Sequence, residues 1–521
     1  MSIAKAYSAQ LIGLNSEIIT VEVDISNGLN AFSVVGLGDR AVEEAKDRIS
    51  AAIKNSGYVS PKQKNQKVVI SLAPADIRKE GPSFDLAMAI AYLTAAKEIE
   101  FDPCRKLFLG ELSLEGNVRR VSGLLPILCQ ASSHGYTQVF IPNENREEAS
   151  LARNITIYPV SSLQEVISHL MHCEQIIPLE TGENILKSSS STSYLETDMS
   201  TIRGNETTKR GLEIAAAGAH NIIMCGPPGT GKTMLAQCFS SILPPLSYEQ
   251  SVEVTSIHSV AQVLKQGLVT IPPFRAPHHT ASYPSIIGGG SFPKPGEITL
   301  AHRGVLFMDE FPEFDRSVIE ALRQPLEDRF ITISRARGVI TFPAQCILIA
   351  SMNPCPCGKG KENGCTCSEH IISSYRRKIS GPIIDRLDIW LNINKIDYAK
   401  LAAKTATSET SAVIRERVIS ARNIQLKRYC KFNISSVNKQ SGRNEQKYFN
   451  AEMSAQDIEK MVIMCDTARS LLTLSAEKFG LSGRAFHRVI KVAQTIADLS
   501  KKDMILKEHI LEALQYRQKL N

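Results

Sequence analysis

One segment of this 521-residue chain constrains its fold more than any other, because a fixed spacing of glycines lies between an apolar strand and a helix. Ile222-Ile-Met precedes the segment, and Met234-Leu-Ala-Gln-Cys-Phe follows it. A strand, a glycine-rich loop and a helix in this order form a P-loop, in which backbone N–H groups and the positive end of the helix bind phosphate. The segment itself consists of Gly226, Pro227, Pro228, Gly229, Thr230, Gly231, Lys232 and Thr233.

The P-loop predicts a nucleotide site, and a second strand predicts its acidic residues. We expect Lys232 to reach the β- and γ-phosphates of ATP and the Thr233 hydroxyl to bind Mg²⁺. The apolar strand Val305-Leu-Phe-Met is followed by Asp309 and Glu310. Asp309 can hold Mg²⁺, and Glu310 can polarise the attacking water as a general base.

Two further positions are expected at the nucleotide. The apolar strand 346–352 ends at Asn353, whose side chain can reach the γ-phosphate and the attacking water. The alternative is that Asn353 is only a turn residue before Pro354. This order of strands resembles that of the AAA+ ATPases, and the resemblance implies that Ile202 lies near the adenine of ATP.

Length and polar segments predict a multidomain α/β protein. A chain of this length holds roughly three domains. The serine-rich stretch that begins at Ser188 predicts a flexible linker over 181–200. We expect an N-terminal domain over 1–180, an ATPase core over 201–396 and a helical lid over 397–521.

Composition limits the partners and the compartment. A net charge of +7 permits a nucleic-acid partner without arguing for one. Apolar runs do not approach the roughly 18–20 residues of a membrane span, and the N-terminus lacks a signal-peptide pattern. Most of the cysteines stand singly in apolar segments, which is typical of reduced thiols. These features predict a cytoplasmic protein without a membrane partner.

The N-terminal domain shows both strand and helix patterns, and it is expected to be α+β. Glu80-Gly-Pro-Ser83, the segment 110–118 and the segment 139–145 resemble the Lon-protease-like fold, also called S5 domain 2-like. Ser83 matches the protease nucleophile, but the segment 122–127 holds no lysine to activate it. A serine without a base is a poor nucleophile. We therefore expect a structural Ser83, capping the next helix, and a domain that serves assembly or DNA contact.

A basic hairpin and an insert follow the P-loop. Residues 329–343 alternate around the tip Arg335-Ala-Arg337-Gly, which predicts a β-hairpin. Hairpin and insert resemble elements of the clade that holds magnesium chelatase and MCM helicases, where they face the pore of a ring. The resemblance implies that Arg335 and Arg337 contact DNA phosphates, with Lys294 a further candidate. The alternative is a solvated or salt-bridged basic turn.

Four cysteines form a separate cluster in a loop rich in glycine and proline. Cys355, Cys357, Cys365 and Cys367 have the spacing C-x-C-x7-C-x-C. Four thiolates can close a tetrahedral Zn²⁺ site, and His370 could also serve as a ligand. The alternative is a loop of free thiols, since a disulfide is disfavoured in the cytoplasm.

Arginines in two later segments are expected to act on the nucleotide of a neighbouring subunit. Residues 379–389 resemble the arginine-finger segment of the same clade, which makes Arg386 the finger. The alternative ties Arg386 to Asp385 or Asp388 within its own chain. The helix that begins near Ser482 resembles the second-sensor helix of the AAA+ lid, with Arg484 as the sensor and Arg488 as the alternative.

Together these features, in this order, resemble the bacterial magnesium-chelatase-like AAA+ family called YifB or ComM over nearly the whole chain. The resemblance implies a homo-hexameric, ATP-driven DNA helicase that acts on single-stranded and branched DNA. Such a helicase would promote branch migration in natural transformation, alongside recombination proteins. The same ATPase motifs also fit three other classes: a metal-chelatase motor, a protein-remodelling ATPase and an ATP-dependent protease. The Lon-like N-terminal domain disfavours the chelatase motor, because the resemblance implies that chelatase motor subunits lack such a domain. The missing lysine disfavours the protease.

Overall fold

A computed structural model of the chain describes ten stretches separated by short gaps. They are residues 3–182, 197–264, 267–290, 293–335, 338–360, 364–394, 409–432, 435–437, 444–446 and 448–517. The chain divides into two units. Unit 1 comprises Met1–Ser191 and Ser247–Thr270, and unit 2 comprises Thr192–Leu246 and Ile271–Asn521. The segment 247–270 therefore belongs with the N-terminal unit, whereas its position in the sequence suggested the ATPase core.

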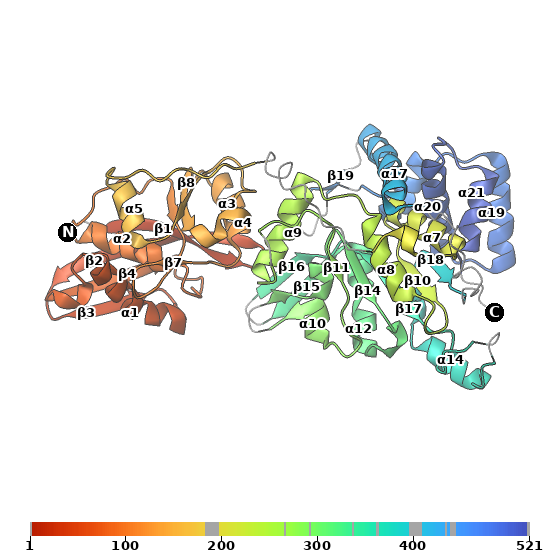
Figure 1. The fold of residues 1–521 in the computed structure, drawn as a ribbon, viewed down its shortest axis with the longest axis horizontal. Coiled ribbons are helices and arrows are strands. Elements are labelled where there is room, and N and C mark those ends of the chain that lie inside the picture. The colour runs from red at the N-terminus through yellow and green to blue at the C-terminus, as the bar shows by residue number, and fades with distance from the viewer. Residues whose placement is uncertain are drawn as a thin grey trace. The chain divides into compact units, whose positions relative to one another are not determined.

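Unit 1 is built on a four-stranded sheet of order β1-β2-β4-β3 and a three-stranded parallel sheet of order β5-β8-β9 (Figure 1). Along β2, buried and more exposed residues alternate, as in a sheet with one covered face. The strands of the two sheets and of the small β6-β7 pair are β1 (Ala4–Ile12), β2 (Asn15–Asn27), β3 (Ala31–Val35), β4 (Gln66–Ala73), β5 (Lys106–Phe108), β6 (Glu111–Leu112), β7 (Val118–Arg119), β8 (Gln138–Pro142) and β9 (Thr156–Val160).

Helices complete the core of unit 1. Nine of the eleven residues of α2 are buried, because this apolar helix lies inside the unit. The helices are α1 (Arg40–Asn55), η1 (Pro61–Gln63), α2 (Asp85–Ala95), α3 (Leu124–Ser133), η2 (Asn143–Asn145), α4 (Arg146–Ala149), α5 (Leu163–Leu170) and α9 (Tyr248–Val260). The unit thus contains both strands and helices, as its sequence patterns predicted. The predicted cap is wrong: the N-cap residue of α2 is Phe84, and no side chain caps the helix.

Helix α9 is anchored on unit 1 by a buried carboxylate. The Ser259 hydroxyl donates to Glu148 at 2.5 Å, and the Leu125 amide donates to the same carboxylate oxygen at 2.9 Å. The Gly123 amide in turn donates to the Ser259 hydroxyl at 2.9 Å. Burial raises the pKa of Glu148. Each buried polar group of this cluster thus has a partner, which a buried carboxylate requires.

Unit 2 contains a five-stranded parallel sheet of order β11-β14-β17-β10-β18, drawn in Figure 1. The central strands are almost wholly buried because helices cover both faces, as in other parallel sheets. The strands are β10 (Ile222–Cys225), β11 (Phe274–Arg275), β14 (Val305–Met308), β17 (Ile347–Met352) and β18 (Ile389–Asn392). All three strands predicted around the nucleotide site are present.

Short strands and helices surround this sheet. The predicted hairpin is confirmed: β15 pairs with β16 antiparallel, with Arg335 opposite Gly338. The remaining strands are β12 (Gly288–Gly289), β13 (Lys294–Pro295), β15 (Phe330–Arg335), β16 (Gly338–Pro343), β19 (Ser435–Val437) and β20 (Asn444–Gln446). The helices are η3 (Met199–Thr201), α7 (Glu206–Gly218), α8 (Lys232–Ser241), α10 (Tyr283–Ile287), α11 (Glu297–Leu300), η4 (Phe311–Glu313), α12 (Arg316–Ala321), α13 (Arg323–Asp328), α14 (Glu369–Arg377) and α15 (Gly381–Ile384).

The C-terminal part of unit 2 is helical and shares one hydrophobic core with the sheet. Its helices are α17 (Ser411–Lys431), η6 (Asn450–Glu452), α18 (Ala455–Met461), α19 (Asp466–Phe479), α20 (Gly483–Leu499) and α21 (Lys507–Gln515). Residues 183–196 of the predicted linker lie outside the described residues. Among the described residues, helices are too short or too polar to cross a membrane.

Candidate nucleotide site and its arginines

The P-loop joins β10 to α8, and its conformation explains its glycines. Gly229 and Gly231 have φ values of +75° and +82°, in the left-handed region that side chains disfavour. Nothing lies within 4 Å of a Cβ built at either residue, so backbone conformation and not space requires glycine here. Gly231 is the N-cap residue of α8, so the loop leads directly to the helix N-terminus. This is the geometry that binds phosphate.

Lys232 connects the P-loop with the third strand. Its ammonium group donates to the carbonyl oxygens of Gly226 at 2.7 Å and Pro227 at 3.1 Å. It also donates to the side-chain oxygen of Asn353 at 3.1 Å. Burial lowers the pKa of Lys232. Because β17 lies between β14 and β10, the side chain of Asn353 meets the P-loop, which favours a sensor over a simple turn residue.

The acidic pair lies at the same edge of the sheet. The Thr233 hydroxyl donates to Asp309 at 3.1 Å, so the two expected Mg²⁺ ligands are in contact. The Ser351 hydroxyl on β17 donates to the other oxygen of Asp309, which also accepts from the Glu310 amide at 3.0 Å. Thr233 and Asp309 supply the oxygen ligands that Mg²⁺ prefers, so this donor set fits that ion.

A histidine that the sequence did not single out contacts the expected general base. Glu310 has a φ of +52°, and its carboxylate lies 3.4 Å from Nδ1 of His279. His279 follows β11, a two-residue strand next to β14. Arg275 on β11 forms two hydrogen bonds of 2.7 Å with Glu297, which fixes this edge strand. His279 therefore lies where it can orient Glu310.

Ile202 lies directly after η3, and its side chain is buried in the main core of unit 2.

Arg386 lies at the opposite edge of the same sheet. It precedes β18, whereas the P-loop follows β10, and these two strands are parallel with Ile222 opposite Ile389. The four residues of each strand separate the two edges by about 13 Å. Arg386 is therefore remote from Lys232 of its own chain.

The partner of Arg386 is neither of the aspartates considered from the sequence. Its guanidinium forms an ion pair with Glu327 on α13 and donates to the carbonyl of Pro382 at 2.8 Å. Arg484, on the first turn of α20, lies 4.0 Å from the same carboxylate and is 62% exposed, against 12% for Arg386. Burial, and then the charges of Arg484, Arg488 and Arg323, lower the pKa of Arg386. Two guanidinium groups thus share one carboxylate, which leaves positive charge at this edge.

Arg488 has a different role from Arg484. It donates to buried Asp388 at 2.9 Å, and Asp388 also accepts from the Asn221 amide at 3.1 Å. Although burial opposes it, the charge of Arg488 and then His220 lower the pKa of Asp388. Arg488 therefore ties the lid helix to the start of β18, and Arg484 is the more accessible of the two.

The expected DNA contacts lie around the hairpin. Arg335 is the last residue of β15, and Arg337 lies outside the described residues. Lys294 is exposed on β13, opposite Gly289. The hairpin is fixed to unit 2 by Ile331, Ile333 and Phe342, which are buried. The paired strands are therefore anchored in unit 2.

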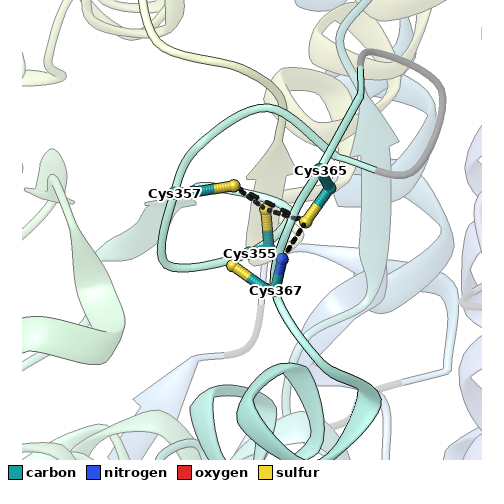
Figure 2. Close-up of side chains that lie close together, drawn as sticks. All are labelled: Cys355, Cys357, Cys365 and Cys367. Atoms are coloured by element: carbon teal, nitrogen blue, oxygen red, sulfur yellow. Dashed lines mark hydrogen bonds between the residues drawn. The ribbon is translucent and has the colours of Figure 1, made fainter.

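The side chains of the four clustered cysteines lie close together. Their sulfur atoms all lie within 4.8 Å of one another, and Figure 2 shows the side chains gathered in one loop. The Lys359 amide, and then the Cys355 thiol, lower the pKa of Cys357 to about 6. His370, on α14, is not part of this group of ligand atoms among the described residues.

Comparison with known proteins gives three family matches along the chain. Residues 198–401 match the family described as magnesium chelatase, subunit ChlI, and residues 408–517 match its C-terminal family. Residues 21–145 match the family described as subunit ChlI of Mg-chelatase. Since this last name also attaches to the N-terminal unit, that unit does not separate a chelatase motor from the other classes.

Individual relatives cover almost the full length. The chain is 39% identical over 520 residues to the competence protein ComM of Haemophilus influenzae, covering 99% of this chain and 98% of that protein. It is 38% identical over 523 residues to the uncharacterized protein YifB of Escherichia coli, covering 99% and 97%. It is 26% identical over 202 residues to the DNA replication licensing factor mcm2 of Xenopus tropicalis, covering 36% of this chain and 20% of that protein.

Proposed function

The chain belongs to the magnesium-chelatase-like AAA+ ATPase family of ComM and YifB, and from this premise we propose that it is a ring-forming, ATP-driven DNA motor. Its substrates are single-stranded and branched DNA, and its role is branch migration during the integration of transforming DNA. A hexamer is the ring expected for this clade. The relation to a competence protein over nearly the full chain supports the role, and the partial likeness to a replication licensing factor supports DNA as the partner.

One observation supports the proposal that the subunits form a ring. The phosphate-binding residues and Arg386 occupy opposite edges of one parallel sheet. A site that needs both must combine two subunits, and a head-to-tail contact of this kind forms a ring when the rotation between subunits closes. The excess positive charge shared by Arg386 and Arg484 around Glu327 suits this edge for the phosphates of a neighbour's ATP.

The proposed chemistry divides the roles between two subunits. In one subunit Lys232 binds the phosphates, Thr233 and Asp309 hold Mg²⁺, and Glu310 accepts a proton from the attacking water. Mg²⁺, when bound, neutralises charge on the phosphates. His279 orients the carboxylate of Glu310 through their 3.4 Å contact, and Asn353 senses the γ-phosphate next to Lys232. The next subunit supplies Arg386 and Arg484.

The DNA-contacting part of the proposal is the β15–β16 hairpin. Arg335 is the last residue of β15 and pairs with Gly338 of β16. A basic tip on an anchored base can hold phosphates without reading sequence. Lys294 offers a further exposed charge on β13. ATP-dependent shifts between subunits would then carry a strand along the pore.

The test is ATP-dependent strand displacement on a three-stranded branched DNA, with Lys232→Ala as the control. We expect displacement by the wild type and none by the variant. Failure to displace any strand, together with ATP turnover that no DNA stimulates, would refute the DNA motor and favour a chelatase-like or protein-remodelling ATPase.

A second experiment tests the hairpin. Arg335→Ala with Arg337→Ala should weaken the binding of single-stranded DNA. The slope of log affinity against log salt should fall by roughly 0.7 for each lost phosphate contact. Arg376→Ala with Arg377→Ala removes the same charge from α14 and serves as the matched control. Equal salt slopes in the wild type and the hairpin variant would refute the assignment.

A further inference from the structure

The cysteine loop occupies a place where two parts of the nucleotide site meet. Cys355 lies two residues after Asn353, whose side chain accepts from Lys232 at 3.1 Å. Gly358 in the same loop packs on the P-loop: a Cβ built there would lie 2.9 Å from Cδ of Pro228. Gly358 also has a φ of +77°, so this close approach requires glycine. The loop thus touches both the end of β17 and the P-loop.

The sulfur atoms have the spacing of a metal site. The Sγ atoms of Cys355, Cys357 and Cys365 are separated by 3.3, 3.5 and 3.4 Å (Figure 2). A tetrahedron of thiolates around Zn²⁺, with Zn–S of about 2.3 Å, has S–S edges of about 3.8 Å. A disulfide would need about 2.05 Å. Cys367 lies within the same 4.8 Å group and completes four ligands.

Backbone amides already face these sulfur atoms. The Gly360 amide donates to Cys355 at 3.3 Å, and the Cys367 amide donates to Cys365 at 3.3 Å. Such bonds stabilise negative charge on sulfur and orient the ligand, as the outer partners of metal ligands do. Four thiolates this close would repel one another unless a cation lay between them.

We propose that Cys355, Cys357, Cys365 and Cys367 bind one Zn²⁺, and that this ion fastens the end of β17 to the P-loop. With zinc bound, the loop supports Pro228 from one side and holds Asn353 beside Lys232. Without zinc, the contacts that position Pro228 and Asn353 loosen. Lys232 and Thr233 are unchanged and can still bind nucleotide. Zinc therefore acts on hydrolysis more than on ATP binding. Only this effect on hydrolysis relies on the ATPase reaction proposed above, since metal binding is independent of it.

The experiment uses the full chain, purified with reductant and without chelators. Cys365→Ser with Cys367→Ser removes two ligands and leaves the residues next to Asn353 and Pro228 unchanged. Cys104→Ser with Cys173→Ser changes two exposed cysteines of unit 1 and is the matched control. Metal content is measured by mass spectrometry. Co²⁺ offered to the metal-free chain reports tetrahedral thiolate coordination through its visible absorption.

We expect one zinc per chain in the wild type and the control, and loss of zinc in the ligand variant. The ligand variant should lose up to about a hundredfold in kcat, because small misplacements of catalytic groups have effects of this size. Its KM should change less. As a check on folding, zinc is stripped from the wild type with a mercurial and then restored. ATP turnover should fall and recover in step with the zinc content.

Three results would overturn the proposal. The first is a wild-type chain without zinc, or with iron in its place. The second is a Co²⁺ spectrum without thiolate bands. The third is a zinc-free chain that turns over ATP at the wild-type rate, which would refute the fastening role. Because metal content and ATP turnover are measured without DNA, failure of the strand-displacement test leaves these outcomes unaffected.

Discussion

Mixing two inactive variants tests whether Arg386 completes the site of a neighbouring subunit. Lys232→Ala destroys the phosphate site but leaves Arg386 in place, and Arg386→Ala does the reverse. The two edges of the sheet are about 13 Å apart along its strands, which is farther than one arginine side chain extends. A chain that carries Lys232→Ala should therefore donate its arginine to a neighbour that carries Arg386→Ala.

The expected magnitudes follow from counting interfaces. Arg386→Ala alone should lower kcat by at least about 10³-fold, the lower end for an arginine finger. In a 1:1 mixture of the two variants, half of the subunits have an intact P-loop. Half of their neighbours supply an intact arginine. About one quarter of the sites is therefore complete, and turnover should return to about a quarter of the wild-type value.

The assay is steady-state ATP turnover after the variants are mixed, dissociated and reassembled. A mixture no more active than the mean of its two components would refute the shared site. A second mixture provides the control: wild type with a chain that carries both substitutions. A shared site predicts about one quarter of the wild-type turnover, and a site within one chain predicts about one half.

Three further predictions concern contacts around the two sites. Arg488→Ala leaves Asp388 buried without its main partner and should lower the free energy of unfolding by about 3–5 kcal/mol. Because Arg488 lowers the pKa of Asp388, the wild type keeps this stability above pH ~4 and loses it as the pH falls further. Urea titrations at several pH values can measure both effects. His279→Ala should lower kcat for ATP turnover roughly tenfold with little change in KM, because Glu310 loses its orientation. Steady-state kinetics, with Glu310→Gln as the reference variant, would measure this loss. Ser259→Ala removes a hydrogen-bond partner of buried Glu148 and should lower the free energy of unfolding by about 1–3 kcal/mol. The loss should appear as faster hydrogen exchange in α3.

The residues of the candidate nucleotide site were predictable from local patterns because they follow strands that are apolar along their whole length. β10, β14 and β17 were each recognisable, and in a parallel sheet their carboxyl ends meet at one edge. The residues after them, from the P-loop to Asp309 and Asn353, could therefore be assigned without the structure. The cysteine cluster was predictable for a similar reason, since its spacing lies within one short loop.

Other contacts could not be read from local patterns. β11 has only two residues, too few to show a period, so His279 behind it carried no signal. The ion pair of Arg386 with Glu327 joins positions 59 residues apart, and nothing near either residue indicates it. Ser351 lies within an apolar strand, and its sequence context does not indicate that its hydroxyl donates to Asp309. In each case the information lies in tertiary pairing, which a single sequence does not display.

The placement of α9 changes how the two units are connected. A single linker over 181–200 would make the N-terminal unit separable. The chain instead leaves unit 2 after Leu246, forms α9 within unit 1, and returns at Ile271. The outgoing connection starts five residues after α8, the helix that carries Lys232, and the incoming one ends three residues before β11. Tyr248 and Val252 on α9 pack against the core of unit 1, so a chain cut at the linker would expose apolar surface. The N-terminal unit is therefore joined to the ATPase core by three chain connections, one at the linker and two around α9.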